Sequence, residues 1–442
     1  MFARAPLSWG QLLAVLLVGV VIVYLLVAAL SPGYVSDIGT NKVWGRHIAR
    51  EGIHNIYRIS TDYPPVLLYF FGAAAEIYER FVDPSFAEKP MLASQLYTFL
   101  IKLPGIIFHP IVATVIYRLV RRFGPGVAFW VATAYALNPA VAYDVAHLGQ
   151  TDPVHAAFTL GSIGALVYGQ PLLAGALIAL AALTKPQAWI LLPIVGLGLI
   201  FWYGRRGALL GTLGGAVTAV VVLLPWIVTN RLHHAERFLE ALDNKSVNAQ
   251  ALTAQAHNIW WIPTLLEWRF ISDWETVLGP ISYRMVAMAM VLALVVLVVQ
   301  RMPRLRPHDR LFSYIGLLTV GWFVVTVRAH ENHLFMALPF LAVAWALDRR
   351  FGLLFGLVSA SLLLNLGLHD PLLVGNWAAG PDPGQPLPGW VVAGQVLNVV
   401  LNLLAFAIAL VVTLGLVVRD GVGRYPWTRY PWTRSRTTGG GR

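Results

Sequence analysis

The sequence predicts an all-α polytopic membrane protein. Of its 442 residues, 57% are hydrophobic and only 12% are charged, whereas an ordinary soluble domain carries about a quarter charged residues. Apolar runs such as Leu12 to Leu30 and residues 390–418 are long enough for the roughly 20 residues that cross a hydrocarbon core. A soluble globular protein is therefore excluded. The chain contains no cysteine, which also excludes a disulfide framework, a thiolate metal site and a cysteine nucleophile.

Apolar segments recur along the whole chain. The first, Leu12 to Leu30, is longer than a signal-peptide core and is not followed by a small-residue cleavage site, so we expect a retained span. Further spans are predicted at residues 98–120, 127–146, 153–169, 171–185, 187–203, 208–228, 279–300, 311–328, 332–347, 352–368 and 390–418. Together they predict about 12 transmembrane helices.

The net charge of +11 is unevenly placed along these spans. Threading the spans alternately across the membrane puts one set of basic residues on one side: Arg4, Arg118, Arg121, Arg122, Arg205, Arg206, Arg301, Arg304, Arg306, Arg310, Arg349, Arg350 and the arginine-rich tail. Cytoplasmic loops carry such an excess of Lys and Arg. This side is therefore predicted to be cytoplasmic, and the basic charge indicates topology rather than a nucleic-acid partner.

Residues 63–80 are apolar enough to enter lipid, but a full crossing there would invert every later loop. We therefore predict a juxtamembrane or re-entrant helix in the first external loop, started by Pro64 and Pro65. The expected organisation is a first transmembrane helix (1–31), a first external loop with juxtamembrane helices (32–97), a transmembrane core (98–228), an external loop (229–278), C-terminal transmembrane helices (279–418) and a cytoplasmic tail (419–442).

Short polar clusters lie at the predicted external ends of the spans. They contain Ser36 and Asp37, Asp62, HLGQTD (His147 to Asp152), KPQ (Lys185 to Gln187), HNIWW (His257 to Trp261) and RAHENH (Arg328 to His333). A charge at the bilayer centre costs roughly 2.5 to 3.5 kcal/mol on insertion scales, so polar residues mark functional positions in membrane proteins. Because the clusters come from distant parts of the chain and face one side, they predict a shared external cavity.

Each cluster also has a structural interpretation. Asp37 and Asp62 can cap the helices that follow them, and Lys185 can extend from a helix end toward the interface. Trp260 and Trp261 suit an interfacial aromatic belt as well as a sugar-binding platform.

Histidines in the sequence raise the question of a metal site. His330 and His333 are spaced i and i+3 and would share one helix face beside Glu331. HENH is not the HExxH zinc signature, so no metal is predicted. His109 falls inside an apolar span, where a hydrogen-bonded structural histidine is the commoner outcome.

The order of these motifs resembles the GT-C membrane glycosyltransferases that use polyprenyl-phosphate sugars. The motifs are SD after the first span, DYPP at the next helix, KLP (Lys102 to Pro104), LNP (Leu137 to Pro139), GQTD, KPQ, NIWW and HENHLFMALP. The similarity is closest to dolichyl-phosphate-glucose-dependent glucosyltransferases and to bacterial polyprenyl-phosphate-mannose mannosyltransferases. It implies a GT-C-like helical bundle in the cytoplasmic (plasma) membrane with its active site on the external face.

The resemblance implies an inverting hexosyltransferase that moves mannose or glucose from a polyprenyl-phosphate sugar to a lipid-linked or glycan acceptor. The family places its general base in the first external loop, here Asp37. The donor phosphate would be held by Lys185, Arg328, His330 and His333. Substrate binding is expected from Asp62, His147, Gln150, Asp152, Gln187, His257, Asn258 and Trp260. No metal or other cofactor is expected, and the partners are donor, acceptor and bilayer, with no nucleic acid.

The sequence departs from the family pattern in two places. Many relatives carry a second acid beside the first-loop aspartate, whereas Ile38 and Gly39 follow Asp37 here, which argues against a metal-dependent variant. Many relatives also have an aspartate after the KLP helix start, where this chain has His109. Residues 369–442 carry no motif of the family, so acceptor recognition is assigned to them or to residues 230–278.

A transporter and a scaffold subunit are the two alternative classes of protein. A transporter or flippase of a lipid-linked sugar would also be polytopic and basic inside, but it should carry polar groups at mid-membrane and repeat symmetry. The sequence shows neither. A scaffold subunit would not explain an acid and several cations on one face.

Overall fold

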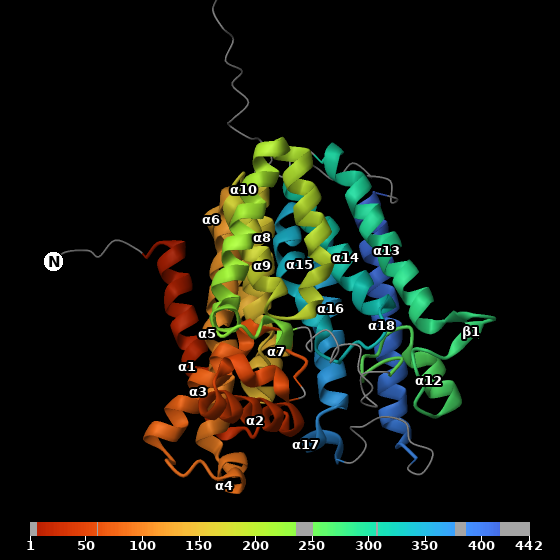
Figure 1. Cartoon of the computed structure of the whole chain (residues 1–442). Coiled ribbons are helices and arrows are strands. Elements are labelled where there is room, and N and C mark those ends of the chain that lie inside the picture. The colour runs from red at the N-terminus through yellow and green to blue at the C-terminus, as the bar shows by residue number, and fades with distance from the viewer. Residues whose placement is uncertain (1–6, 60, 236–250, 306–307, 376–385, 416–442) are drawn as a thin grey trace, which may run out of the picture.

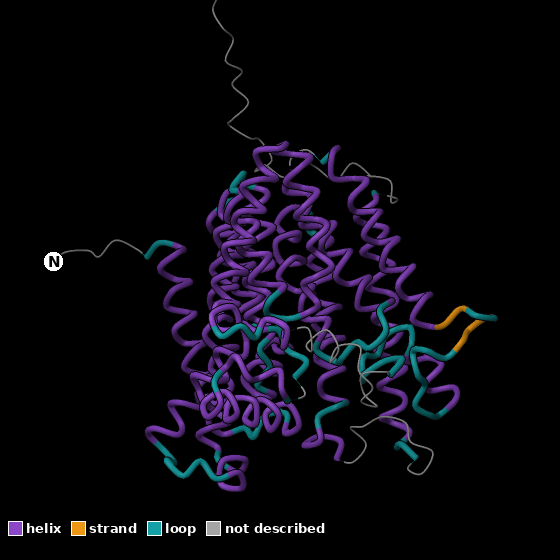
Figure 2. Tube along the Cα trace, viewed as in Figure 1, coloured by secondary structure: helices purple, strands orange, loops and turns teal. Residues whose placement is uncertain are grey.

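The chain folds almost entirely into helices. The structure, a computed structural model, describes residues 7–59, 61–235, 251–305, 308–375 and 386–415. Long helices run side by side as a bundle (Figure 1), and shorter helices gather at one end of it. Figure 2 shows the one pair of strands in the described residues, the antiparallel β1 (Thr276–Leu278) and β2 (Ile281–Ser282). An all-α membrane fold, as the sequence predicts, is confirmed.

The α-helices follow one another in this order: α1 (Trp9–Leu30), α2 (Val35–Glu51), α3 (Pro65–Phe81), α4 (Glu88–Ala93), α5 (Gln95–Val120), α6 (Pro125–Ala136), α7 (Pro139–Ala142), α8 (Asp152–Val167), α9 (Pro171–Ala182), α10 (Leu192–Val228), α12 (Trp261–Glu267), α13 (Tyr283–Arg301), α14 (Leu311–Val325), α15 (Ala337–Leu347), α16 (Arg350–Leu368), α17 (Pro371–Val374) and α18 (Gly389–Leu414). Short 3-10 turns include η1 (Ile53–Arg58), η2 (Arg121–Phe123), η4 (Pro186–Leu191), η8 (His308–Arg310) and η9 (His333–Met336), and η3 (Tyr143–Leu148) is a π-helical turn.

In the part of the chain that the structure describes, six helices are long and apolar enough to cross a membrane: Trp9–Leu30, Gln95–Phe123, Pro186–Val228, Tyr283–Arg304, Arg350–Leu368 and Gly389–Leu414. The other predicted spans coincide with α6, α8, α9, α14 and α15, which have 11 to 16 residues and are shorter than the roughly 20 residues of a full crossing. The count of 12 therefore stays a prediction.

Helix α10 contains two segments rather than one. Gly204 inside it has φ 62° and ψ −157°, a conformation that glycine adopts at little cost. The chain turns back there, and Figure 1 shows the two arms of α10 joined at the top of the bundle. This break lies between the predicted spans 187–203 and 208–228.

Helix α1 shows why the bundle needs an apolar solvent. One face packs inward through Leu13, Leu17, Val20, Tyr24 and Ala28. The opposite face exposes Val15, Val18, Ile22 and Leu26, which are 53% to 64% accessible. A helix that is apolar on all sides and exposes one of them is stable in lipid rather than in water.

Helices pack most closely where glycines remove side chains. A Cβ atom on Gly175 of α9 would lie 1.9 Å from the carbonyl oxygen of Gly211 in α10. A Cβ on Gly214 would lie 2.1 Å from the carbonyl oxygen of Leu172. Small residues at such contacts let membrane helices approach each other backbone to backbone.

The first loop folds onto the end of the bundle. Helices α2, α3 and α4 lie together there in Figure 1. Helix α3 corresponds to predicted segment 63–80; it begins at Pro65 and packs Leu68, Phe71 and Tyr78 into a core shared with Trp44 of α2. This cluster forms a platform beside the polar loops of the bundle.

Candidate functional site

A buried ion pair lies at the centre of the polar loops. Lys185 Nζ is 3.0 Å from Asp152 Oδ1, and the two side chains are only 3% and 1% exposed. Pro153 and Pro186 lie in the first turns of α8 and η4, where proline is favoured and fixes the chain direction. The GQTD and KPQ motifs therefore meet in one contact. Burial opposes the charged amine, but Asp152 raises the pKa of Lys185 above its ordinary value.

Three other segments surround this pair. Asn332 Nδ2 donates to Asp152 Oδ2 at 2.9 Å, which brings the HENH loop to the start of α8. His155, one turn later in α8, places Nδ1 3.7 Å from Asp152 Oδ1. The Tyr63 ring of the DYPP motif lies 5.8 Å from Lys185 Nζ, within reach of a cation–π contact. Four motifs thus converge on a single charge pair.

Asp37 lies in the first turn of α2 and is half-buried. Gln150 Nε2 donates to Asp37 Oδ2 at 2.7 Å, so the GQTD loop orients one oxygen of the carboxylate. The loop approaches closely because Gly149 has φ +82°, and a Cβ there would lie 2.7 Å from Cγ of Lys102. Only glycine suits this backbone conformation beside a neighbouring side chain.

Lys102 of the KLP motif bonds to the backbone of two segments next to this loop. It is fully buried, and its Nζ donates to the carbonyl oxygens of Ser31 at 2.8 Å and of His147 at 3.1 Å. These carbonyls lie at the ends of α1 and of the π-helical turn, where helix dipoles present negative charge. Lys102 thereby ties the end of α1 to the GQTD loop.

The HENH loop carries one exposed and one buried group. The His330 side chain is 52% exposed, and its Nδ1 lies 3.9 Å from Oε2 of Glu331, whose side chain is 6% exposed. Burial, with a further contribution from Asp37, raises the pKa of Glu331 to about 8. His333 accepts a hydrogen bond from the His330 amide at 3.2 Å, and burial lowers the pKa of His333 well below its ordinary value.

His330 lies close enough to four other predicted site residues to interact with their charges. These are Asp37, Asp62, Asp152 and Lys185. Of this group Asp62 is exposed. Acids from the first loop and the cation of the KPQ motif therefore share one electrostatic neighbourhood with the HENH loop.

His147 belongs to a neighbouring contact. Its Nε2 lies 3.0 Å from Oδ2 of Asp370, and its Nδ1 lies 3.1 Å from the Ser31 hydroxyl. Tyr143 donates to the same oxygen of Asp370. Asp370 lies in the part of the sequence without family motifs, so sequence reasoning gave no signal for it.

Arg328 is predicted to bind donor phosphate. In the structure it forms a bidentate ion pair with Asp273. Nε lies 2.8 Å from Asp273 Oδ2, and an Nη atom lies 3.2 Å from Oδ1. Asp273 is fully buried. This geometry holds the loop before β1 against the loop after α14, and phosphate would have to share the guanidinium with Asp273.

His257 is at the centre of a buried polar network. Its backbone amide donates to Asn365 at 2.9 Å, and its carbonyl oxygen accepts from Asn402 at 2.9 Å. Its ring nitrogens lie 3.0 Å from Asn398 and 3.0 Å from His369. Burial and the neighbouring His369 lower the pKa of His257 well below its ordinary value. The network joins the loop at 251–261 to α16 and α18.

Asn258 and Trp260 cap the end of α14. Both amide hydrogens of Asn258 are donated to carbonyls, to Phe323 at 3.1 Å and to Thr326 at 2.9 Å. Trp260 Nε1 donates to the Val325 carbonyl at 2.8 Å. The last carbonyls of a helix lack partners within the helix, so the NIWW motif supplies them. These contacts give the motif a structural role in addition to the predicted one.

Among the described residues, several buried groups have polar atoms without a hydrogen-bond partner, and two of them, Gln187 and Asp144, lie in the KPQ motif and near the GQTD motif. Gln187, a predicted substrate ligand, has such an atom in Oε1. Asp144, in the π-helical turn, is fully buried, and neither carboxylate oxygen is paired there. It lies within electrostatic reach of Asp152 and Lys185. The sequence signal was an acid at the end of an apolar span, five residues before the GQTD motif.

His109 is buried between two aromatic rings. Its ring centroid lies 4.7 Å from Tyr24 and 5.3 Å from Tyr135. Nε2 lies 3.2 Å from the Ala136 carbonyl. These contacts fit the structural histidine that the sequence favoured.

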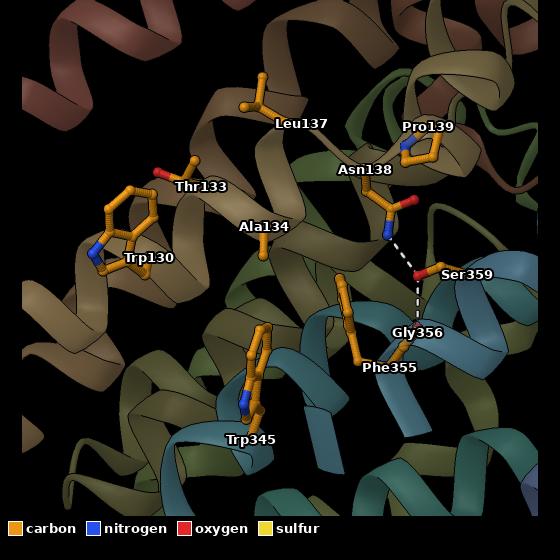
Figure 3. A pocket seen from close by; sticks show the side chains of 10 residues that line it. All are labelled: Trp130, Thr133, Ala134, Leu137, Asn138, Pro139, Trp345, Phe355, Gly356 and Ser359. Carbon is orange, nitrogen blue, oxygen red and sulfur yellow. Dashed lines mark hydrogen bonds between the residues drawn. The ribbon is translucent and has the colours of Figure 1, made fainter. Parts of the chain in front are cut away.

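A mostly apolar hollow opens on the side of the bundle, between α6, the end of α15 and α16 (Figure 3). It has a volume of about 410 Å³ and is lined by Trp130, Leu137, Trp345 and Phe355 among others. Its polar contacts include the hydrogen bond that Asn138 of the LNP motif donates to Ser359 at 2.6 Å and the one that Ser359 donates to the Phe355 carbonyl at 2.7 Å. Trp130 and Leu137 are 63% and 58% exposed, as expected of side chains that face lipid.

Comparisons with known proteins support the resemblance seen in the motifs. The model of glycosyltransferase family 87 matches residues 109–327. Family 87 is a GT-C-type family, so the predicted similarity to GT-C membrane glycosyltransferases is confirmed. A search among curated proteins found no match.

Two solved structures are similar in part. One is the Archaeoglobus fulgidus oligosaccharyltransferase in the apo form, with a TM-score of 0.39 and 13% identity over 89% of this chain. The other is the oligosaccharyltransferase AglB from Archaeoglobus fulgidus in complex with an inhibitory peptide and a dolichol-phosphate, with a TM-score of 0.35 and 11% identity over 90% of this chain. The chain spans 56% of the length of each.

Proposed function

We propose that this chain, similar to the membrane glycosyltransferases of family 87, transfers a hexose from a polyprenyl-phosphate sugar to a lipid-linked or glycan acceptor. Mannose and glucose are the favoured hexoses, and the reaction takes place on the external face of the membrane. The observation that carries the proposal is that Asp37 and Lys185 both lie within electrostatic reach of His330. A proton acceptor and phosphate-binding groups are what this chemistry requires.

The proposed reaction is a single inverting displacement. The acceptor hydroxyl oxygen attacks the anomeric carbon from the face opposite the phosphate, and Asp37 takes the hydroxyl proton. The bond from the anomeric carbon to the phosphate oxygen breaks, and the phosphate keeps the electron pair. The bond from Gln150 to Asp37 Oδ2 supports this role, because it fixes the carboxylate without supplying a proton to it.

The cations and imidazoles stabilise the leaving phosphate. Lys185 uses one hydrogen on Asp152, and an ammonium carries three. His330 is exposed toward the same neighbourhood, and His333 lies against it with ring centroids 5.1 Å apart. Arg328 is a further candidate if phosphate shares the guanidinium with Asp273. Charge-assisted hydrogen bonds of this kind are about twice as strong as neutral ones.

The remaining predicted residues are assigned to the acceptor and to the shape of the site. Asp62 lies near His330 and suits a hydrogen bond to a sugar hydroxyl. Gln187 offers its unpaired Oε1, and His147 contributes through its pair with Asp370. His257, Asn258, Trp260, Gln150 and Asp152 act by holding the loops that carry these groups.

The direct test of this function is a transfer assay with the purified chain in lipid. Labelled sugar should move from a polyprenyl-phosphate donor to acceptor lipid, with inversion at the anomeric carbon, and should not move from a nucleotide donor. Transfer from the nucleotide sugar would contradict the proposal. Movement of the intact donor between leaflets without transfer would favour a flippase.

The membrane orientation is tested separately. Because the chain has no cysteine, single variants Asp37→Cys and His330→Cys can be labelled with an impermeant maleimide in intact cells. We expect both to react from outside, and Arg121→Cys and Arg205→Cys to react only after the membrane is opened, because basic loops stay cytoplasmic. Opposite accessibility of positions 37 and 330 would exclude a shared external site.

A further inference from the structure

Glu331 is a buried acid for which the proposed reaction has no role. Its side chain is 6% exposed, and Oε2 has no hydrogen-bond partner among the described residues. A buried polar atom without a partner costs about 1 to 3 kcal/mol. Such an atom in a native site calls for an unseen partner.

Acids outnumber fixed cations around Glu331. Asp37 and Asp152 act on it, and Lys185 is the one cation among its main electrostatic neighbours. The adjacent His330 and His333 are neutral donors and acceptors at pH 7 in this setting, since burial lowers the pKa of both imidazoles. A site so rich in carboxylates would repel a phosphate if Glu331 were also charged.

Other charged and titratable groups face Glu331 from neighbouring elements. The phenol of Tyr34, just before α2, interacts with it, and Asp144 of the π-helical turn lies within electrostatic reach. Burial raises the pKa of Tyr34 above its ordinary value, so this phenol stays neutral. Lys185 is the one group among these neighbours that favours a negative charge on Glu331. The acids disfavour that charge, and the neutral phenol of Tyr34 does not compensate it.

We propose that Glu331 works as a neutral carboxylic acid whose Oε2–H donates a hydrogen bond to a non-bridging oxygen of the donor phosphate. The inference rests on the proposed function and names a specificity determinant for it. The proton removes one negative charge from the site and supplies a donor that a carboxylate lacks. The site then accepts an anion despite its acids.

The pH dependence of donor binding follows from this role. Burial raises the pKa of Glu331 to about 8, so the binding form prevails below that pH and disappears above it. A phosphodiester donor keeps one charge over this range, and the pKa of Lys185 is raised, so neither titrates there. With binding restricted to the protonated form, affinity should be about 30-fold weaker at pH 9.5 than at pH 6.5.

The experiment measures binding of polyprenyl-phosphoryl-mannose to the full chain in nanodiscs between pH 6.5 and 9.5. Glu331→Gln keeps an N–H donor and cannot ionise, so it should bind at every pH nearly as well as the unaltered chain at pH 6.5. Glu331→Ala has no donor and should bind weakly throughout, with no slope. Glu51→Gln, an exposed acid at the end of α2, is the matched control and should keep the full slope.

The outcomes separate this inference from the proposed function. Binding by the unaltered chain that does not change with pH, or a slope that persists in Glu331→Gln, would overturn the role of Glu331 while the function stands. If neither the unaltered chain nor any variant bound polyprenyl-phosphoryl-mannose or polyprenyl-phosphoryl-glucose at any pH, the function itself would be overturned. Melting temperatures at pH 6.5 and 9.5 verify that the folded chain is being compared.

Discussion

Asp37→Asn should lower sugar transfer by roughly 10² to 10⁴, the usual contribution of a general base, while donor binding survives. Asparagine keeps the size and the bond from Gln150 but has no oxygen that accepts the acceptor's proton. The measurement is a single-turnover assay with radiolabelled donor, run beside equilibrium donor binding. A loss in transfer with unchanged donor affinity identifies a group needed for chemistry rather than for binding.

Glu76→Gln is the control for this variant, since Glu76 is an exposed acid on α3 at the same end of the bundle. It should transfer sugar at the unaltered rate. The competing candidates are Asp62 and Asp152, of which Asp152 is already engaged by Lys185 and Asn332. If Asp37→Asn retained near-normal transfer while Asp152→Asn were inactive, the base would belong to the GQTD loop instead.

Lys185→Met should weaken donor binding by about 10- to 150-fold, because hydrogen bonds to charged groups contribute about 1.5 to 3 kcal/mol. It should also lower the free energy of unfolding, since Asp152 would then be a buried charge with its cation removed. Donor affinity and thermal unfolding in nanodiscs measure the two effects. Lys42→Met is the control, because Lys42 is a buried lysine whose ammonium is bonded to the carbonyls of Leu92 and Ser94 rather than to a predicted site residue.

A double variant separates the two roles of Lys185. In Lys185→Met with Asp152→Asn, no charge is left unpaired, so most of the lost stability should return. Donor binding should stay weak, because no ammonium meets the phosphate. Recovery of binding together with stability would show that Lys185 acts only through the fold.

The sequence predicted the helices well because their signal is local. A helix that crosses the bilayer must be a long apolar run, and each such run can be recognised without knowing which other helices pack against it. Even the break in α10 was expected, since arginines at 205 and 206 separate two apolar runs. The number of spans was harder, because α9 and α15 have 12 and 11 residues and are shorter than a full crossing.

The contacts within the site were predictable only in part. The alternating spans predicted Asp37, Lys185 and His330 on one face of the membrane. No local rule pairs Lys185 with Asp152, 33 positions away. Arg328 was assigned to phosphate as a cation of the RAHENH cluster. Its ion pair with Asp273 was not predicted, because Asp273 is distant in sequence and carries no motif. Pairing of this kind is decided by packing between segments, which a single sequence does not encode in its local pattern.

Glu331 and Asp144 show a second limit. A sequence does not show whether an acidic residue is exposed to solvent or buried among other acids, although burial decides its protonation state. The π-helical turn that holds Asp144 likewise has no strong sequence signature, although such turns recur at functional sites.

The network around His257 has a consequence for how the chain is assembled during synthesis. Asn365 and Ser361 on α16, and Asn398 and Asn402 on α18, direct amides and a hydroxyl toward the loop and toward each other. Each helix leaving the ribosome alone would carry these groups into the bilayer unpaired, at a cost that its apolar residues must outweigh. The loop at 251–261 is made before either helix, so it can serve as the template on which they dock. A ribosome stopped before α18 would therefore release a chain whose last membrane helix is poorly held and open to quality-control proteases.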